Sequence, residues 1–352
     1  MLEANGSGAT AVAEGPQSRS AEAGIDVLRR VMADFRTLPP MVLGSECATL
    51  RDRLAAVAEG RAFLAHCGRP ASTGPISAEA VRATVRVLRQ MALIIAYTTS
   101  LPLVQVAQIG GPRTDRPPLR EELREEHRRA LGELNLFRAL TGVERFDLRE
   151  AHASTMRFVR SDAVGGRYDA VAGPMDRAVR FLEACAPPGG INVDGPGFFV
   201  SWEAGPLGYE AAMTRREAAA GPHYNTCGHL IVLRESDQNP YGPHAEYCAR
   251  IGNPIAVRIG PATRAAELVA LLDRLDPGFE PGRIVLLLRA ANAALVARVA
   301  AAGHPVVWLL DAAADEPREL FGLLQEHGAR VGGVHARDSA GCIELAFSLG
   351  GR

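Results

Sequence analysis

The second half of the chain alternates short apolar runs with longer stretches whose apolar residues recur at helical spacing. Each apolar run is of strand length, and a helical stretch with one apolar face follows it. The runs occupy residues 255–259, 283–290, 304–311 and 329–338, and the helical stretches between them occupy residues 264–275, 292–303 and 317–328. Strands and helices in strict alternation are typical of repeated βα units and a parallel sheet.

The first half of the chain continues the same alternation less regularly. It contains predicted helices at residues 23–36, 45–60 and 78–97, and predicted strands at 61–66, 101–109, 197–201 and within 223–233. Ser45 or Thr49 is expected to cap the second of these helices. About eight strands in series predict an α/β fold, a (β/α)8 TIM barrel with an N-terminal helical extension. We expect residues 23–352 to form this single domain, and residues 1–22, which are small and polar, to be a disordered tail.

Polar residues stand at or near the ends of the strands in the second half. They are Arg258, Arg289, Asp311 and His335. The C-terminal strand ends of a (β/α)8 barrel converge on one mouth, where the chemistry of such proteins takes place. Two arginines at this mouth favour an anionic, phosphate- or carboxylate-bearing substrate.

Composition excludes several classes of function. The net charge of −1 argues against nucleic acid as the main partner. All 39 residues counted as Lys or Arg are arginine, which excludes the lysine chemistry of Schiff-base aldolases, pyridoxal-phosphate enzymes and P-loop NTPases. The six cysteines show no disulfide or zinc spacing, and residues 91–97 are too short an apolar run to span a membrane. We expect a cytoplasmic protein with free thiols and no signal peptide.

One cysteine has a histidine two residues away, in the segment Thr226-Cys227-Gly228-His229. On an extended chain these two side chains point the same way, so Cys227 is a conceivable nucleophile. A small buried cysteine is the more common explanation of such a residue.

A collinear set of segments resembles the class II, plant-like family of 3-deoxy-D-arabino-heptulosonate-7-phosphate (DAHP) synthases. The set comprises residues 51–64, 130–140, 202–215, His229, the pair His244 and Glu246, residues 253–261, Arg289, and residues 304–311, 332–335 and 344–347. The resemblance implies a (β/α)8 barrel that condenses phosphoenolpyruvate with erythrose 4-phosphate on a divalent metal. It also implies a dimer or a larger assembly, and we expect a homodimer.

The metal ligands that the resemblance implies are replaced in this chain. Family members hold the metal with a cysteine, a histidine, a glutamate and an aspartate. The corresponding positions carry Pro70, Ala314 and Arg337, and the aspartate's segment is missing between Ala340 and Glu344. Cys67 and His66 lie close to the first position, where a shifted loop would restore one ligand at most. We therefore expect no metal and no other cofactor.

The anion-binding positions that the resemblance implies are partly kept. Arg258 stands where the family has lysine, and Arg289 matches an arginine of the family. Arg234 is a substitute for a further arginine, from a new position. His335, Asp311, His244, Glu246 and Glu203 also match.

Three hypotheses follow. The first is a metal-independent enzyme of specialised metabolism that acts on a small anionic carbonyl compound. Its acid/base groups would be His335 and Asp311, its electrophile Arg337, and its substrate-binding residues Arg258, Arg289, Arg234, Glu203, His244 and Glu246. The second is a catalytically silent barrel that binds a partner. The third is a true DAHP synthase.

Overall fold

The computed structural model describes residues 33–68, 77–110, 120–143, 198–217 and 221–337, together with residues 153, 173, 174, 176 and 177. The expected tail at residues 1–22 lies outside the described residues, as do residues 23–32 of the first expected helix. Pro70 and residues 338–352 lie outside them too.

Eight parallel strands close into a barrel, in the order β1-β10-β9-β8-β7-β6-β3-β2. These strands are β1 (Phe63–Cys67), β2 (Leu103–Gly110), β3 (Phe199–Glu203), β6 (Leu230–Leu233), β7 (Ile255–Ile259), β8 (Ile284–Leu288), β9 (Val307–Asp311) and β10 (Val331–Ala336). The predicted (β/α)8 barrel is confirmed. A short antiparallel pair, β4 (Thr214–Arg216) and β5 (His223–Asn225), stands outside the barrel.

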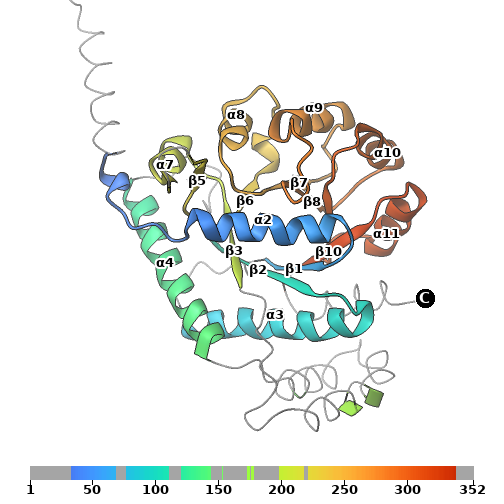
Figure 1. Ribbon diagram of the computed structural model, residues 1–352, viewed down its shortest axis with the longest axis horizontal. Coiled ribbons are helices and arrows are strands. Elements are labelled where there is room, and N and C mark those ends of the chain that lie inside the picture. Colours follow the sequence, from blue (N-terminus) through green and yellow to red (C-terminus); the bar gives the residue numbers. More distant parts are fainter. Residues whose placement is uncertain are drawn as a thin grey trace, which may run out of the picture.

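Helices surround the barrel and lead from one strand to the next (Figure 1). They are α2 (Gly44–Ala58), α3 (Ala78–Thr99), α4 (Arg120–Val143), α7 (Leu207–Ala212), α8 (Pro243–Arg250), α9 (Ala265–Leu275), α10 (Ala293–Ala302) and α11 (Pro317–Glu326). A single 3-10 turn, η1 (Glu235–Asp237), follows β6. Helices α8 to α11 line one side of the molecule, and α3 and α4 line the other (Figure 1).

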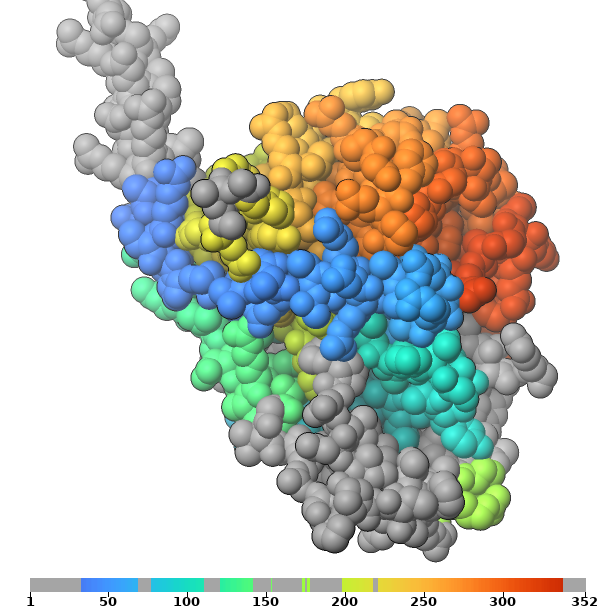
Figure 2. All heavy atoms as spheres, viewed as in Figure 1, coloured from blue at the N-terminus to red at the C-terminus, as the bar shows by residue number. Residues whose placement is uncertain are grey.

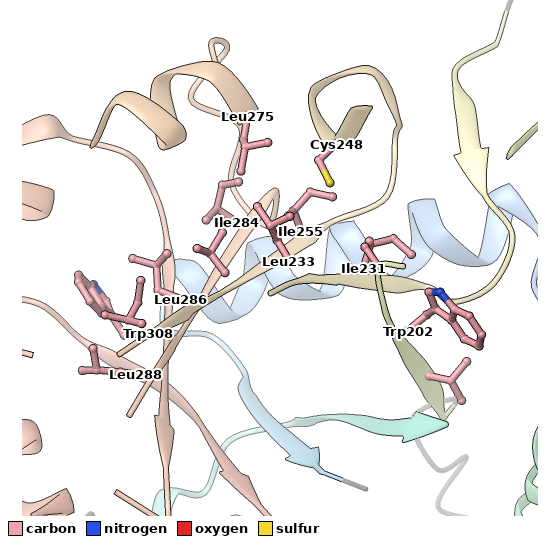
Figure 3. Packing of buried hydrophobic residues seen from close by; sticks show 14 of the residues in the cluster. Trp202, Ile231, Leu233, Cys248, Ile255, Leu275, Ile284, Leu286, Leu288 and Trp308 are labelled. Atoms are coloured by element: carbon pink, nitrogen blue, oxygen red, sulfur yellow. The ribbon is translucent and has the colours of Figure 1, made fainter. Parts of the chain in front are cut away.

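Side chains alternate between the two faces of each strand, because successive residues of a strand point to opposite sides. The outward set packs beneath the helices. Figure 3 shows part of this layer, in which Ile255 lies near Cys248 of α8, Ile284 near Leu275 of α9, and Trp308 near Leu286 and Leu288. Burying this apolar layer is the main stabilising contribution of the helices that cover the barrel.

The inward set fills the lower part of the barrel with aliphatic side chains. Its members include Leu64, Val106, Phe199, Val232, Ala256, Val285, Leu287, Val307 and Leu309. Leu50, Leu54 and Val57 of α2 join this cluster and close the N-terminal end of the barrel. Figure 2 shows α2 as a blue band across this end, between the orange and red helices and the cyan α3. Because side chains fill the N-terminal end of the barrel, a ligand of the barrel interior would have to bind at the C-terminal strand ends.

The structure corrects the predicted start of α2. Neither Ser45 nor Thr49 is the capping residue. Leu43 occupies the N-cap position, and its backbone N–H donates to the Glu46 carboxylate at 2.8 Å. The Thr49 hydroxyl donates to the Ser45 carbonyl inside the helix at 2.9 Å. The helix therefore begins without a side-chain cap, and a carboxylate in its first turn accepts from the backbone N–H of the N-cap residue.

No helix in the described part of the chain has the length and apolar character needed to cross a membrane.

A cavity at the base of the barrel should lower the free energy of unfolding. Leu54 is completely buried, so we expect Leu54→Ala to lower the free energy of unfolding by about 3 kcal/mol, through lost burial and the cavity left behind. Leu43 is 54% exposed, and Leu43→Ala should change it by less than about 0.5 kcal/mol. Urea unfolding of both variants measures this. Equal destabilisation by the two would show that α2 does not close the barrel.

Candidate active site

The inward positions turn from apolar to polar at the C-terminal ends of the strands. On β1, His66 follows the buried Leu64 two residues on, and on β9, Asp311 follows Leu309 in the same way. The inward polar residues are His66, Gln108, Ser201, Glu203, Arg258, Asp311 and His335. Because all continue the inward-facing alternation of their strands, they converge above the aliphatic core. We call this group the mouth residues.

Two histidines on neighbouring strands form the buried floor of the mouth. His66 and His335 are paired in register between β1 and β10, and each is 1% exposed. Their Nδ1 atoms are 2.6 Å apart, and His66 Nε2 is 2.9 Å from the Ser201 hydroxyl. His335 Nε2 is buried and has no hydrogen-bond partner among the described residues. The three side chains make one hydrogen-bonded chain that ends at this nitrogen.

Both histidines are held neutral by their surroundings. Burial, and after it the positive charges of Arg258 and Arg337, lower the pKa of His335 to about 3. Burial lowers the pKa of His66 as well, with contributions from His335 and Arg258. Desolvation penalises the imidazolium form, and a nearby cation does the same. The floor of the mouth therefore presents uncharged imidazoles.

Asp311 and Arg337, which the sequence groups with His335 as predicted catalytic residues, both lie close to His335. Asp311 is paired in register with His335 between β9 and β10 and is buried. Its Oδ1 accepts a hydrogen bond from the backbone N–H of Ala313 at 2.9 Å. Arg337 directly follows β10 and is exposed. The structure thus brings these three residues to one side of the mouth.

Arg258 and Glu203 form an ion pair within the mouth. The Nη2 of Arg258 donates to Glu203 Oε2 at 2.9 Å, and the two side chains are 25% and 18% exposed. Gln238 Nε2 donates to the backbone carbonyl of Arg258 at 2.6 Å, which ties η1 to this strand end. A guanidinium has five N–H donors, so the bond to Glu203 leaves capacity for a bound anion.

Arg234 and His244 lie at the rim, where they share an aspartate. Arg234 Nε donates to Asp237 Oδ2 at 2.9 Å, and His244 Nδ1 is 3.9 Å from Asp237 Oδ1. His244 Nε2 donates to the carbonyl of Gly205 at 3.0 Å, just beyond the end of β3. Both predicted residues therefore lie at the edge of the mouth, where Arg234 forms an ion pair with Asp237.

Two predicted substrate-binding residues stand apart from the mouth residues. Arg289 is exposed and lines a groove of about 580 Å³ between α10 and α11, together with the acidic Asp315, Glu316 and Glu319. Glu246 forms an ion pair with Arg250 one turn further along α8, on an exposed side of that helix. The structure groups neither of them with the histidine floor. The resemblance identified both positions. Arg289 also continues the inward alternation of β8, two residues after Leu287, whereas Glu246 lies on a helix.

The implied metal positions that the structure describes do not fit a divalent cation. Ala314 follows β9, is nearly buried and has no donor atom in its side chain. Arg337 places a cation where the resemblance implies a carboxylate ligand. In the described part of the chain, no three His, Cys, Asp or Glu side chains are grouped in a way that would hold a metal ion. That the protein binds no metal stays a prediction.

Cys227 is a buried structural thiol. Burial raises its pKa well above the ordinary value, and the charge of Glu210 adds to this. Its Sγ lies 3.6 Å from the Tyr209 hydroxyl, in the layer outside the barrel. A protonated, enclosed thiol is a poor nucleophile, so the alternative of a catalytic cysteine fails.

Sequence reasoning missed three of the mouth residues, Gln108, His66 and Ser201. His66 was considered only as a neighbour of a lost metal ligand, and Ser201 was treated as the end of a strand. Counting inward positions finds all three, because Leu64 and His66 alternate as Leu309 and Asp311 do, and Gln108 follows Val106 in the same way. Phe199, Ser201 and Glu203 follow the same rule on β3.

Comparison with a family model and comparison with individual proteins both identify the same family. The model of the Class-II DAHP synthetase family matches residues 22–115 and 112–319. The chain belongs to this family. It is 33% identical to the phospho-2-dehydro-3-deoxyheptonate aldolase of Streptomyces coelicolor over 88% of this chain and 82% of that protein. It is 32% identical to the enzyme of that name from Mycolicibacterium smegmatis, over 81% of this chain and 70% of that protein.

Among solved structures, a DAHP synthase of Thermotoga maritima aligns with a TM-score of 0.37 and 12% identity, covering 82% of this chain and 68% of that chain. A likeness at this level adds nothing to the barrel topology described above. Membership of the class-II DAHP synthetase family rests on the sequence comparisons, and the mouth residues are described from this chain alone.

The neutral state of His335 predicts how stability depends on pH. Its pKa is lowered from 6.5 to about 3 by folding, so between these values the unfolded chain binds a proton that the folded protein does not. Its contribution to stability is therefore full above pH 6.5 and falls as the pH is lowered, by up to about 1.4 kcal/mol per pH unit. His335→Gln should make the decline of unfolding free energy between about pH 7 and about pH 5 shallower in urea unfolding.

His223→Gln is the matched control, because His223 is exposed on β5. It should leave the pH dependence as in the unchanged protein. A slope that His335→Gln leaves unaltered would mean that His335 is protonated in the folded protein.

Proposed function

We propose that this member of the class-II DAHP synthetase family binds a small anionic carbonyl compound in the barrel mouth and acts on it without a divalent metal. One observation carries the proposal. The mouth combines a cationic side chain, Arg258, with neutral imidazoles and a buried carboxylate. At the same time, Ala314 and Arg337 stand where the resemblance implies metal ligands.

The anionic group of the substrate would bind at Arg258. The Arg258 side chain is 25% exposed, and a charge-assisted hydrogen bond is stronger at such a site than in water. Glu203 holds the guanidinium in place from the neighbouring side of the mouth. Arg for Lys at this position changes the recognition from a point charge to a planar fork, which suits carboxylate and phosphate oxygens.

The carbonyl group would be polarised on the opposite side, near His335 and Arg337. In the family's reaction a metal supplies this polarisation. Arg337 carries a fixed positive charge directly after β10. Because its side chain is exposed, it is able to reach a ligand above His335. Asp311, which is buried beside His335, is the candidate for general base.

A second candidate function is that of the family itself, condensation of phosphoenolpyruvate with erythrose 4-phosphate. The identities of 33% and 32% to two proteins named phospho-2-dehydro-3-deoxyheptonate aldolase favour it. It requires some of the metal's ligands to come from outside the described residues, among which no three His, Cys, Asp or Glu side chains are grouped to hold a metal ion.

Binding of phosphoenolpyruvate tests the anion site. Arg258→Gln should weaken binding measured by titration calorimetry at least about tenfold, because it removes a charge-assisted hydrogen bond worth about 1.5–3 kcal/mol. Arg258→Lys should lose less, because it keeps the charge. Arg298→Gln, on the exposed face of α10, is the control and should bind as the unchanged protein does. Unaltered binding by Arg258→Gln would refute the site, and no binding by any form would favour a catalytically silent barrel.

Turnover separates the two candidate functions. We expect phosphoenolpyruvate and erythrose 4-phosphate to give no manganese-dependent release of phosphate. Phosphate release that manganese stimulates and a chelator abolishes would identify a true DAHP synthase and overturn metal independence.

A further inference from the structure

One carboxylate is completely enclosed behind the rim of the mouth. Glu210 on α7 is 0% exposed, and the proposed function gives it no role. Its Oε1 accepts hydrogen bonds from the backbone N–H of Gly205 at 2.6 Å and from Nε1 of Trp202 at 3.1 Å. Its Oε2 accepts from Nδ2 of Asn225 at 2.5 Å. A buried carboxylate is costly unless it is well hydrogen-bonded, so its presence here calls for an explanation.

The three partners of Glu210 can only donate. A backbone N–H and an indole N–H do not accept hydrogen bonds. The amide of Asn225 is fixed in orientation as well, because its Oδ1 accepts from the backbone N–H of Cys227 at 2.9 Å, which turns Nδ2 towards Glu210. The proton of a carboxylic acid would have no acceptor among these groups, so they fit a carboxylate. Burial raises the pKa of Glu210, and the three hydrogen bonds oppose this rise.

Two of these hydrogen bonds lie on either side of Glu203 in the chain. Trp202 directly precedes Glu203 on β3, and Gly205 follows it by two residues. The carbonyl of Gly205 accepts from His244 Nε2 at 3.0 Å, so both polar backbone groups of this residue are held. Glu203 therefore stands between two points of the chain that Glu210 fixes.

The indole of Trp202 is confined by its neighbours. It is 2% exposed, and a Cβ on Gly110 at the end of β2 would overlap its ring. A Cβ on Gly228, just before β6, would lie 2.8 Å from the Cβ of Trp202. The strands on both sides thus pack directly against this side chain. Because the ring has no room to move, its bond to Glu210 ties the carboxylate firmly to β3.

We infer that Glu210 is a positioning residue of the mouth: by fixing the chain on both sides of Glu203, it sets where the Glu203 carboxylate holds the guanidinium of Arg258. The inference rests on the proposed function, in which Arg258 binds the anionic group of the substrate. Glu203 Oε2 accepts from Arg258 Nη2 at 2.9 Å, and this pair links the buried carboxylate to the ligand. A binding group has to be held within about 0.5 Å of its working position, which the hydrogen bonds and packing behind it provide.

Glu210→Gln removes the charge and keeps the shape of the side chain. An amide has one oxygen, so it can accept either from the end of β3 or from Asn225, and its NH2 group then faces donors on the other side. We expect Glu210→Gln to weaken phosphoenolpyruvate binding about tenfold in titration calorimetry, because the Glu203–Arg258 pair is no longer held in position.

Exchanging the two side-chain types should restore binding. In Glu210→Gln/Asn225→Asp, the amide stands on α7 and the carboxylate on β5, so the amide oxygen accepts from the end of β3 and its NH2 group donates to the carboxylate. The net charge equals that of the unchanged protein. We expect the double variant to bind phosphoenolpyruvate within about threefold of the unchanged protein. Equal weakening by the single and the double variant would overturn the inference.

Leu54→Ala is the control for lost stability, because Leu54 lies in the cluster at the base of the barrel. It should lower the free energy of unfolding and leave phosphoenolpyruvate binding unchanged. If Leu54→Ala weakened binding as much as Glu210→Gln does, the effect would follow from stability alone, and the inference would be wrong.

The indole N–H of Trp202 gives a readout that needs no ligand. The chain has two tryptophans, so Trp308→Phe assigns both indole signals in nitrogen-15 NMR. We expect Glu210→Gln to shift the Trp202 signal, because the acceptor changes from a carboxylate to an amide, and Leu54→Ala to leave it in place. A signal that Glu210→Gln does not move would show that the bond is absent, and would overturn the inference.

The calorimetric results separate this inference from the proposed function. Phosphoenolpyruvate binding that requires Arg258 and is unaffected by Glu210→Gln would overturn the role of Glu210 and leave the proposed function standing. No binding by the unchanged protein would overturn the proposed anion site, and with it the link from Glu210 to a ligand.

Discussion

The strict alternation of side chains along eight strands is the constraint on which the rest of this structure depends. Because α2 and the inward aliphatic residues fill the lower barrel, the last inward position of each strand is the first that polar groups can occupy. His66, Asp311 and His335 stand side by side at one level for this reason, on three neighbouring strands in register. The rigidity of the barrel then holds their geometry.

Burial and charge work together in the mouth. A buried imidazole is costly to protonate, and the guanidinium groups of Arg258 and Arg337 increase that cost. The mouth can therefore hold fixed cations next to uncharged hydrogen-bonding groups, a combination suited to a substrate with an anionic end and a neutral carbonyl. The pair Arg258–Glu203 keeps part of the positive charge compensated while the site is empty.

Much of the fold could be predicted from the sequence, because β7 to β10 and the helices between them have clear periodicities. The strand at 255–259 has the predicted bounds, and Arg258, Asp311 and His335 lie at the mouth as expected. The cap of α2 could not be predicted, because a carboxylate three residues on replaced the expected hydroxyl. His66 and Ser201 were missed because a lone polar residue at a strand end has no signature until its neighbours are known. Strand periodicity says nothing of Glu246, which lies on α8. Arg289 continues the alternation of β8, but its side chain lines the groove between α10 and α11, which periodicity does not determine.

The central claim is that this barrel mouth works through its arginines and neutral imidazoles in place of a divalent metal. The most direct measurement is the metal content of the purified protein by elemental analysis, after incubation with excess manganese and removal of unbound ions. The account predicts metal well below one equivalent per chain, with the protein still folded. A stoichiometric amount of tightly bound manganese, zinc or iron would contradict it, and would place metal ligands in the segments around Pro70 and beyond Arg337.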